Sequence, residues 1–189
     1  MNKEVLLKQF HCFKHLLLRV EDSQNIQLYI FLTYVFRMRS ISAAGLAFIK
    51  KYEGLRLSAY HCPAGIVTIG YGSTRYPDGR LVMISDELNS EEEATQLLLS
   101  TISIYENAVN ENLSNVNQNQ FDALVSFTYN VGVQAFSEST LLRKAKINVN
   151  DLSISDEFKR WNKASGMVLA GLTARRMEEA KLYSLIPNV

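Results

Sequence analysis

The sequence predicts an α+β fold with a small antiparallel sheet lobe followed by a larger helical lobe. Two observations predict it. Residues about 55–85 alternate between β-rich runs and turn residues, and the chain from Ser90 onward has apolar residues at helical spacing. With 189 residues, 47% of them apolar, the chain is long enough to bury a core. No internal repeat or low-complexity tract interrupts this pattern.

A domain boundary is expected at Ser40, where the net charge and the residue pattern of the sequence change. Residues 1–40 carry six Lys and Arg against three acidic residues, whereas the whole chain has a formal charge of only +1. We therefore expect an apolar and basic N-terminal extension with helical potential over residues 1–40, and a domain over residues 41–189. Within the domain, the sheet lobe is predicted at about 55–85 and the helical lobe at about 90–189.

The extension contains an apolar run of eleven residues, Ile26 to Phe36. This run is too short for a spanning helix, which needs roughly 20 apolar residues, and the acidic Glu21 and Asp22 before it do not suit a signal peptide. Two interpretations stay open: the run packs on the domain as a helix, or it lies upstream of a natural start at Met38. A further hypothesis is peripheral membrane contact through residues 1–40.

The first helix of the domain is predicted from its two ends. Ser42 has the side chain of an N-cap, and Gly54 can supply the left-handed residue that ends a helix. Glu53 then lies on the last turn of this helix. The alternating segment Arg56–Tyr60 and the β-rich run Ile66–Tyr71 follow, with turn residues between them, which predicts a small antiparallel sheet of two or three strands.

The second half of the domain is predicted to be helical. Ser90-Glu91-Glu92-Glu93 has the pattern of a capping box and opens a long helix. Further helices are expected at about 118–130, 139–146, 153–162 and 173–185, because Gly- and Asn-containing breaks separate these segments.

Three polar side chains stand close to the end of the first helix: Glu53, Cys62 and Thr68. Eight residues separate Glu53 from Cys62, and five separate Cys62 from Thr68. Each therefore falls on one of three consecutive elements, a helix end, a turn and a strand, which can converge. Taken alone, Glu53 would be interpreted as a solvated carboxylate and Cys62 as a small turn residue.

The sequence around these residues resembles the phage-type lysozymes, or endolysins, of glycoside hydrolase family 24. The resemblance covers residues from about 40 to 185, and Ser73 stands where family members usually have His. It rests on Glu53-Gly54-Leu55-Arg56, Thr68-Ile69-Gly70-Tyr71-Gly72-Ser73-Thr74, Asn119-Gln120-Phe121-Asp122-Ala123-Leu124, Asn130-Val131-Gly132 and Gly171-Leu172-Thr173-Ala174-Arg175-Arg176. It implies a lysozyme-like fold with the active-site cleft between the sheet lobe and the helical lobe.

The resemblance also implies a reaction, the hydrolysis with inversion of the β-1,4 bond between N-acetylmuramic acid and N-acetylglucosamine. Glu53 would protonate the glycosidic oxygen as general acid, Thr68 would orient the attacking water, and Cys62 would assist. A thiol replaces the usual Asp only imperfectly, so the interpretation of Cys62 as a turn residue stays open. A lytic transglycosylase also stays open, because it needs one Glu but no external water.

The resemblance assigns three further site residues. Arg176 matches an Arg that pairs with the catalytic Glu in relatives and would orient Glu53, although an exposed Arg on a terminal helix is the alternative. Phe127 and Asn130 would face the cleft and bind substrate, with the amide contacting an N-acetyl group. Trp161 is expected to pack in the core instead of binding sugar.

Composition limits the partners. The near-neutral charge gives no strong field for nucleic acid. Cys12 and Cys62 lie far apart, without metal-spaced His, so we expect no disulfide scaffold, structural zinc or cofactor. The predicted partner is the glycan strand of peptidoglycan, bound by a monomer that is made in the host bacterial cytoplasm and acts on the periplasmic cell wall. The alternative is a membrane-active or cell-wall-binding antibacterial protein whose killing is independent of glycosidase activity.

Overall fold

The computed structural model describes residues 38–62 and 64–185. The chain divides into two compact units, Met1–Met38 and Arg39–Val189. Almost all of the first unit, including the apolar run at residues 26–36, lies outside the described residues, so the following concerns the second unit. No helix in the described part of the chain is long and apolar enough to cross a membrane.

The first described helix, α3 (Ala43–Glu53), begins and ends where the sequence predicts. The Ser42 hydroxyl accepts a hydrogen bond from the Gly45 N–H at 3.1 Å. At the other end Gly54 has a φ of +70°, and its N–H donates to the carbonyl of Lys50. Both predicted caps are therefore confirmed, and Glu53 is the last residue of the helix.

Helix α3 is anchored on the helical lobe through Asp122. The Ser42 N–H and hydroxyl each donate to one oxygen of the Asp122 carboxylate. A Cβ on Gly45 would lie only 2.6 Å from Cγ of Asp122, so a side chain cannot fit at this position. The close approach fixes the helix that carries Glu53 against α5.

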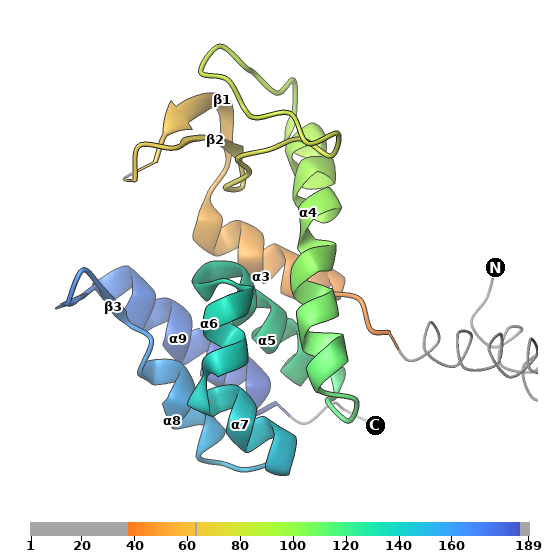
Figure 1. Ribbon diagram of the computed structural model, residues 1–189, viewed down its shortest axis with the longest axis vertical. Coiled ribbons are helices and arrows are strands. Elements are labelled where there is room, and N and C mark those ends of the chain that lie inside the picture. Colours follow the sequence, from red (N-terminus) through yellow and green to blue (C-terminus); the bar gives the residue numbers. More distant parts are fainter. Residues whose placement is uncertain (1–37, 63, 186–189) are drawn as a thin grey trace, which may run out of the picture. The chain divides into compact units, whose positions relative to one another are not determined.

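The sheet lobe contains the predicted antiparallel pair, β1 (Arg56–His61) and β2 (Val67–Gly70) (Figure 1). Tyr60 lies opposite Thr68, and the register is irregular between Arg56 and Tyr60. Beyond β2 the chain folds back on itself, because the backbone of Ile69 forms two hydrogen bonds with that of Ser73. The small antiparallel sheet is confirmed.

The long helix α4 (Glu91–Asn112) runs from the sheet lobe into the helical lobe (Figure 1). Its 22 residues correspond to about 33 Å at the rise of an α-helix. Ser90 caps it by accepting from the Glu93 N–H at 3.2 Å. The predicted capping box is only half formed, because the Glu93 carboxylate accepts from the backbone of Asn89 at 2.7 Å instead of that of Ser90.

The helical lobe is built around α5 (Gln118–Val131), which α3, α4, α6 and α9 contact. Nine consecutive residues of α5, from Gln120 to Thr128, are buried, which makes this helix the centre of the core. The other helices are α6 (Val133–Glu138), α7 (Thr140–Ile147), α8 (Ile154–Lys159) and α9 (Ala170–Tyr183).

The structure differs from the predicted helices between residues 133 and 170. Helix α6 was not predicted, α8 ends before 162, and α9 begins at Ala170 instead of about 173. A hairpin of β3 (Lys163–Ala164) and β4 (Met167–Val168) lies after the predicted helix at 153–162, where only a break was expected. Ser165 and Gly166 both have positive φ, the conformation that closes a two-residue hairpin turn, and strands this short leave no alternating pattern in the sequence.

Candidate active site

Glu53 is held by an arginine of the C-terminal helix. Its Oε1 accepts a hydrogen bond from Nη1 of Arg175 at 2.6 Å, although the two residues are 122 positions apart in the sequence. The Glu53 side chain is 20% exposed and that of Arg175 is 4% exposed. The contact is therefore a largely desolvated charge pair, in which the carboxylate keeps some access to solvent.

The prediction that Arg176 pairs with Glu53 is wrong. Arg176 is fully buried, donates from Nη2 to Oδ1 of Asn130 at 2.9 Å, and lies over the Phe127 ring. Consecutive residues of an α-helix project about 100° apart, so only one of the two arginines can face α3. The alternative of an exposed Arg176 is also wrong, and burial lowers the pKa of Arg176 to about 10.

Phe127 is a core residue and cannot bind substrate in this structure. It is fully buried, and its ring packs edge-on against those of Phe136, Phe158 and Trp161. Trp161 lies against the core, as predicted. Asn130 is exposed, but its Oδ1 is occupied by Arg176. A contact of Asn130 with substrate stays a prediction.

Cys62 and Thr68 meet in the sheet lobe. Backbone hydrogen bonds from Ala64 and Ile66 lower the pKa of the Cys62 thiol, and the Thr68 hydroxyl lies beside this thiol. Thr68 is only 4% exposed, and its hydroxyl donates to the carbonyl of Ile66 at 3.1 Å. The turn therefore favours the thiolate form of Cys62, beside a hydroxyl whose proton is donated to Ile66.

The glycine turn after β2 touches the Glu53 carboxylate. A Cβ on Gly72 would lie 3.7 Å from Oε2 of Glu53 and 3.5 Å from the Tyr129 hydroxyl, and its φ is +99°. Tyr129 donates to the backbone carbonyl of Tyr71 at 2.8 Å, which ties α5 to this turn. Ser73, in the position where the family usually has His, is buried and its hydroxyl has no partner among the described residues.

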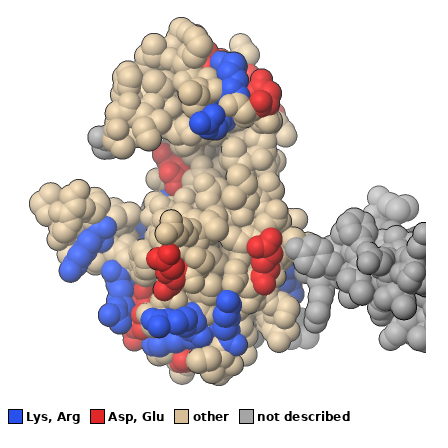
Figure 2. All heavy atoms as spheres, viewed as in Figure 1, with Lys and Arg blue, Asp and Glu red and all other residues tan. Residues whose placement is uncertain are grey.

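A groove starts at this turn and continues along α4. It has a volume of about 340 Å³, at the lower end of the range for small-molecule sites. Its walls are residues 72–77 of the sheet lobe, Ser100, Thr101, Ile104 and Tyr105 of α4, and Tyr129. Figure 2 shows the surface hollowed between the two lobes. Hydroxyl groups and aromatic rings together suit a sugar, which has polar edges and apolar faces.

The sequence analysis did not identify Tyr105 and Tyr129. Burial raises the pKa of both phenols, and the negative charge of Glu53 adds to this rise, so both lie within electrostatic reach of the carboxylate. Their rings pack at 4.9 Å between centroids. Both are aromatic residues on predicted helices, and nothing in the local pattern distinguishes them from core residues.

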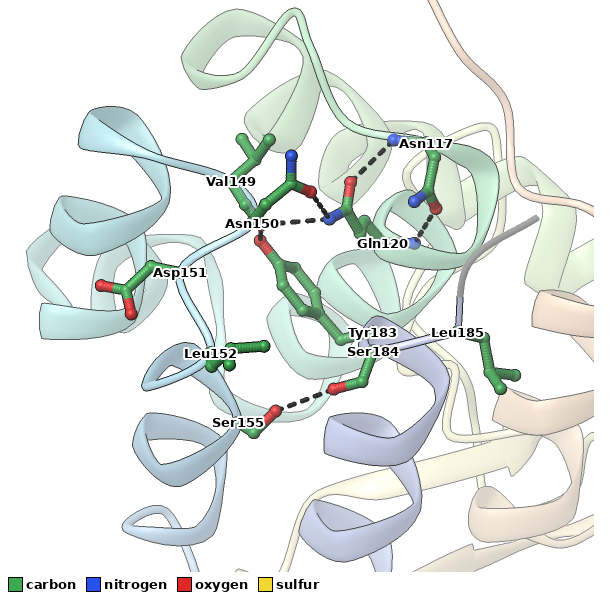
Figure 3. Close-up of a pocket in the computed structure, with 10 residues that line it drawn as sticks. All are labelled: Asn117, Gln120, Val149, Asn150, Asp151, Leu152, Ser155, Tyr183, Ser184 and Leu185. Atoms are coloured by element: carbon green, nitrogen blue, oxygen red, sulfur yellow. Dashed lines mark hydrogen bonds between the residues drawn. The ribbon is translucent and has the colours of Figure 1, made fainter.

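A second cavity, of about 230 Å³, lies in the helical lobe between α5, α9 and the loop before α8 (Figure 3). Its polar groups bond to one another: Gln120 and Tyr183 both donate to the carbonyl of Val149, and the hydroxyls of Ser155 and Ser184 pair. These contacts are structural. Glu53, Cys62 and Thr68 line neither this cavity nor the groove, but the groove begins at Gly72, next to the Glu53 carboxylate.

Similarity to known proteins identifies the chain as a glycoside hydrolase of the muramidase type. Residues 50–179 match the family described as phage lysozyme, and the chain belongs to this family. The chain is 41% identical over 149 residues to the endolysin of Acyrthosiphon pisum secondary endosymbiont phage 1, covering 76% of this chain and 97% of the relative. It is 36% identical over 148 residues to the endolysin of Salmonella phage P22, covering 78% of this chain and all of the relative.

A solved structure supports the same conclusion. The endolysin from Escherichia coli O157:H7 phage FAHEc1 superposes with a TM-score of 0.72 at 38% identity, covering 79% of this chain and 98% of that one. The predicted α+β lysozyme-like fold is confirmed, and the chain is a peptidoglycan-lysing enzyme of this family.

Proposed function

We propose that the enzyme hydrolyses the β-1,4 bond between N-acetylmuramic acid and N-acetylglucosamine with inversion, using Glu53 as the general acid. The observation that carries the proposal is the orientation of the Glu53 carboxylate. Oε1 is bound to Arg175, and Oε2 faces Gly72 at the start of the groove. Because Gly72 has no side chain, Oε2 has room to meet a glycosidic oxygen. Arg175 would orient Glu53, and the protonated form of Glu53 would then donate its proton to that oxygen.

The attacking water would be held from the sheet side. An inverting enzyme needs a water on the face of the sugar opposite the acid. Since the Thr68 hydroxyl donates its proton to Ile66, its remaining lone pairs are acceptors and can orient a water through one of the water protons. Cys62, whose pKa is lowered, would accept a hydrogen bond from the same water when it is ionised.

The groove along α4 would hold the glycan strand, and Asn130 would contact an N-acetyl group. All the groups in this proposal come from one unit of the chain, so we propose that a monomer is active. We also propose that the enzyme is made in the host cytoplasm and reaches the periplasmic cell wall on release. Membrane contact through residues 1–40 stays a hypothesis for the N-terminal segment.

The test is Glu53→Gln, which keeps the shape of the side chain and removes the donated proton. Lysis of exposed peptidoglycan should fall by at least about 100-fold, while circular dichroism shows an unchanged fold. A fully active E53Q protein would overturn the assignment.

Two further measurements separate the rival activities. Mass spectra of the released muropeptides should show reducing ends, because hydrolysis adds water, and anhydro ends would instead identify a lytic transglycosylase. Glu53→Ala should lose bacterial killing together with lysis. Killing by E53A at the wild-type level would instead favour a membrane-active protein.

A further inference from the structure

A second carboxylate lies behind the arginine that holds Glu53. Glu179 on α9 is fully buried, and its Oε1 accepts from Nε of Arg175 at 3.1 Å and from the Ser126 hydroxyl at 2.7 Å. Its Oε2 lies 3.1 Å from Nε of Arg176. Carboxyl and guanidinium groups therefore alternate in one chain of contacts: Glu53, Arg175, Glu179 and Arg176.

The contacts of Arg175 show that Glu179 fixes the orientation of its guanidinium group. The Arg175 guanidinium is planar, and each of its three nitrogens has a different partner. Nε donates to Glu179, Nη1 donates to Glu53, and Nη2 donates to the carbonyl of Ser126 at 3.3 Å. Since a guanidinium presents its donors in a rigid fork, fixing the Nε edge fixes the direction of Nη1.

The burial of Glu179 argues against a role in packing alone. Burial raises the pKa of this carboxyl, and the two guanidinium groups oppose that rise. A buried ion pair is weak evidence for stability, because apolar residues of similar volume often stabilise a core as well or better. Glu179 accepts hydrogen bonds at Oε1 from Ser126, Arg175 and Arg176, so one of its oxygens joins both arginines to α5.

We infer that Glu179 is a positioning residue of the reaction, acting through Arg175. It holds Arg175 so that Nη1 engages Oε1 of Glu53 and Oε2 stays turned to the groove. It also balances the positive charge of the second arginine, Arg176. The inference rests on the proposed role of Glu53 as the acid.

Removing the charge of Glu179 should change the pH dependence of the reaction, whereas a loss of packing alone would not. The groups that act electrostatically with Glu53 are Arg175 and Arg176 of α9, Tyr105 of α4 and Tyr129 of α5. The two tyrosines are neutral, because burial raises the pKa of each. Without the charge of Glu179, two guanidinium groups would favour ionised Glu53.

The experiment is the pH–rate profile of peptidoglycan hydrolysis by the full-length Glu179→Gln variant. We expect kcat to fall about 10- to 100-fold with little change in KM, since misplacement of a catalytic group acts on the reaction step. We also expect the alkaline limb of the profile to move to lower pH. The matched control is Glu178→Gln, which lies on the same helix and pairs with the exposed Lys51. It should behave as the wild type.

A compensating variant separates positioning from charge. In Arg176→Met combined with Glu179→Gln, one positive and one negative charge are removed, so the alkaline limb should return toward that of the wild type. If E179Q does not fold, Ser126→Ala takes its place, because it removes one hydrogen bond to Glu179 and leaves the charges. S126A should lower kcat by a smaller factor without changing KM.

The outcomes are distinguishable. A folded E179Q variant with a wild-type kcat and pH profile would overturn the inference, as would a wild-type kcat for S126A when E179Q is unfolded. If the alkaline limb stays displaced in the double variant, the charge-balance part is wrong. An active E53Q protein would instead overturn the proposed function, whatever the Glu179 variants show.

Discussion

The acid side of the site and the water side are built differently. Glu53 depends on contacts with residues more than 100 positions away, through Arg175 and then Glu179. Thr68 and Cys62 depend on their own turn, because their hydrogen-bond partners lie between residues 62 and 68. The position of the proposed acid is therefore a property of the helical lobe as a whole, whereas the position of the proposed water site is a property of one local turn.

The largest effect on both stability and activity is expected for Arg175→Met. The substitution leaves Glu179 buried beside one guanidinium instead of two, and breaking a buried ion pair costs about 3–5 kcal/mol. The free energy of unfolding in urea should fall by this amount, and lysis should fall about 100-fold because Glu53 loses its support. Arg160→Met is the control, since that side chain is 72% exposed, and it should change stability by no more than about 0.5 kcal/mol.

Thr68→Val should separate activity from stability. Valine has nearly the same shape but cannot accept a hydrogen bond from water, so lysis should fall about 100-fold while the free energy of unfolding changes by at most about 1.5 kcal/mol. Thr128→Val is a matched control, because its buried hydroxyl also donates to a nearby backbone carbonyl. A T68V enzyme with normal lysis would remove the proposed water site.

The smallest effect is expected for Cys62→Ala, and it should depend on pH. Because the pKa of Cys62 is lowered, the thiolate forms at a lower pH than in a free cysteine, and its contribution grows as pH rises through that pKa. The ratio of wild-type to C62A lysis rates should increase between about pH 6 and pH 9. Cys62→Ser should follow C62A at alkaline pH, since serine does not ionise there. A ratio that is constant with pH would mean that Cys62 is only a turn residue.

Local signals predicted the elements whose ends are fixed by single side chains. Ser42, Gly54 and Ser90 marked helix ends correctly, because a cap is formed within a few residues of the sequence. The same reasoning placed Glu53 at a helix end. The hairpin at residues 163–168 was missed, since two-residue strands are too short to show a period.

The errors at the site have a common physical cause. Arg175 and Arg176 are adjacent, and the rotation of α9 against α3 decides which of them reaches Glu53. Phe127 lies on α5, which is surrounded on several sides, so its pattern does not show which face meets the groove. Contacts of this kind depend on packing between distant segments, and a single sequence does not contain that geometry.

Gly45 has a consequence for the stereochemistry of the reaction. Its close approach to Asp122 makes the helix of Glu53 part of the helical lobe, while Thr68 belongs to the sheet lobe. The spacing between the acid and the catalytic group opposite it distinguishes inverting from retaining enzymes, because an inverting enzyme needs room for a water between them. That spacing is therefore set by the angle between the lobes. A tilt would widen or narrow it while leaving the arginine contact of Glu53 unchanged.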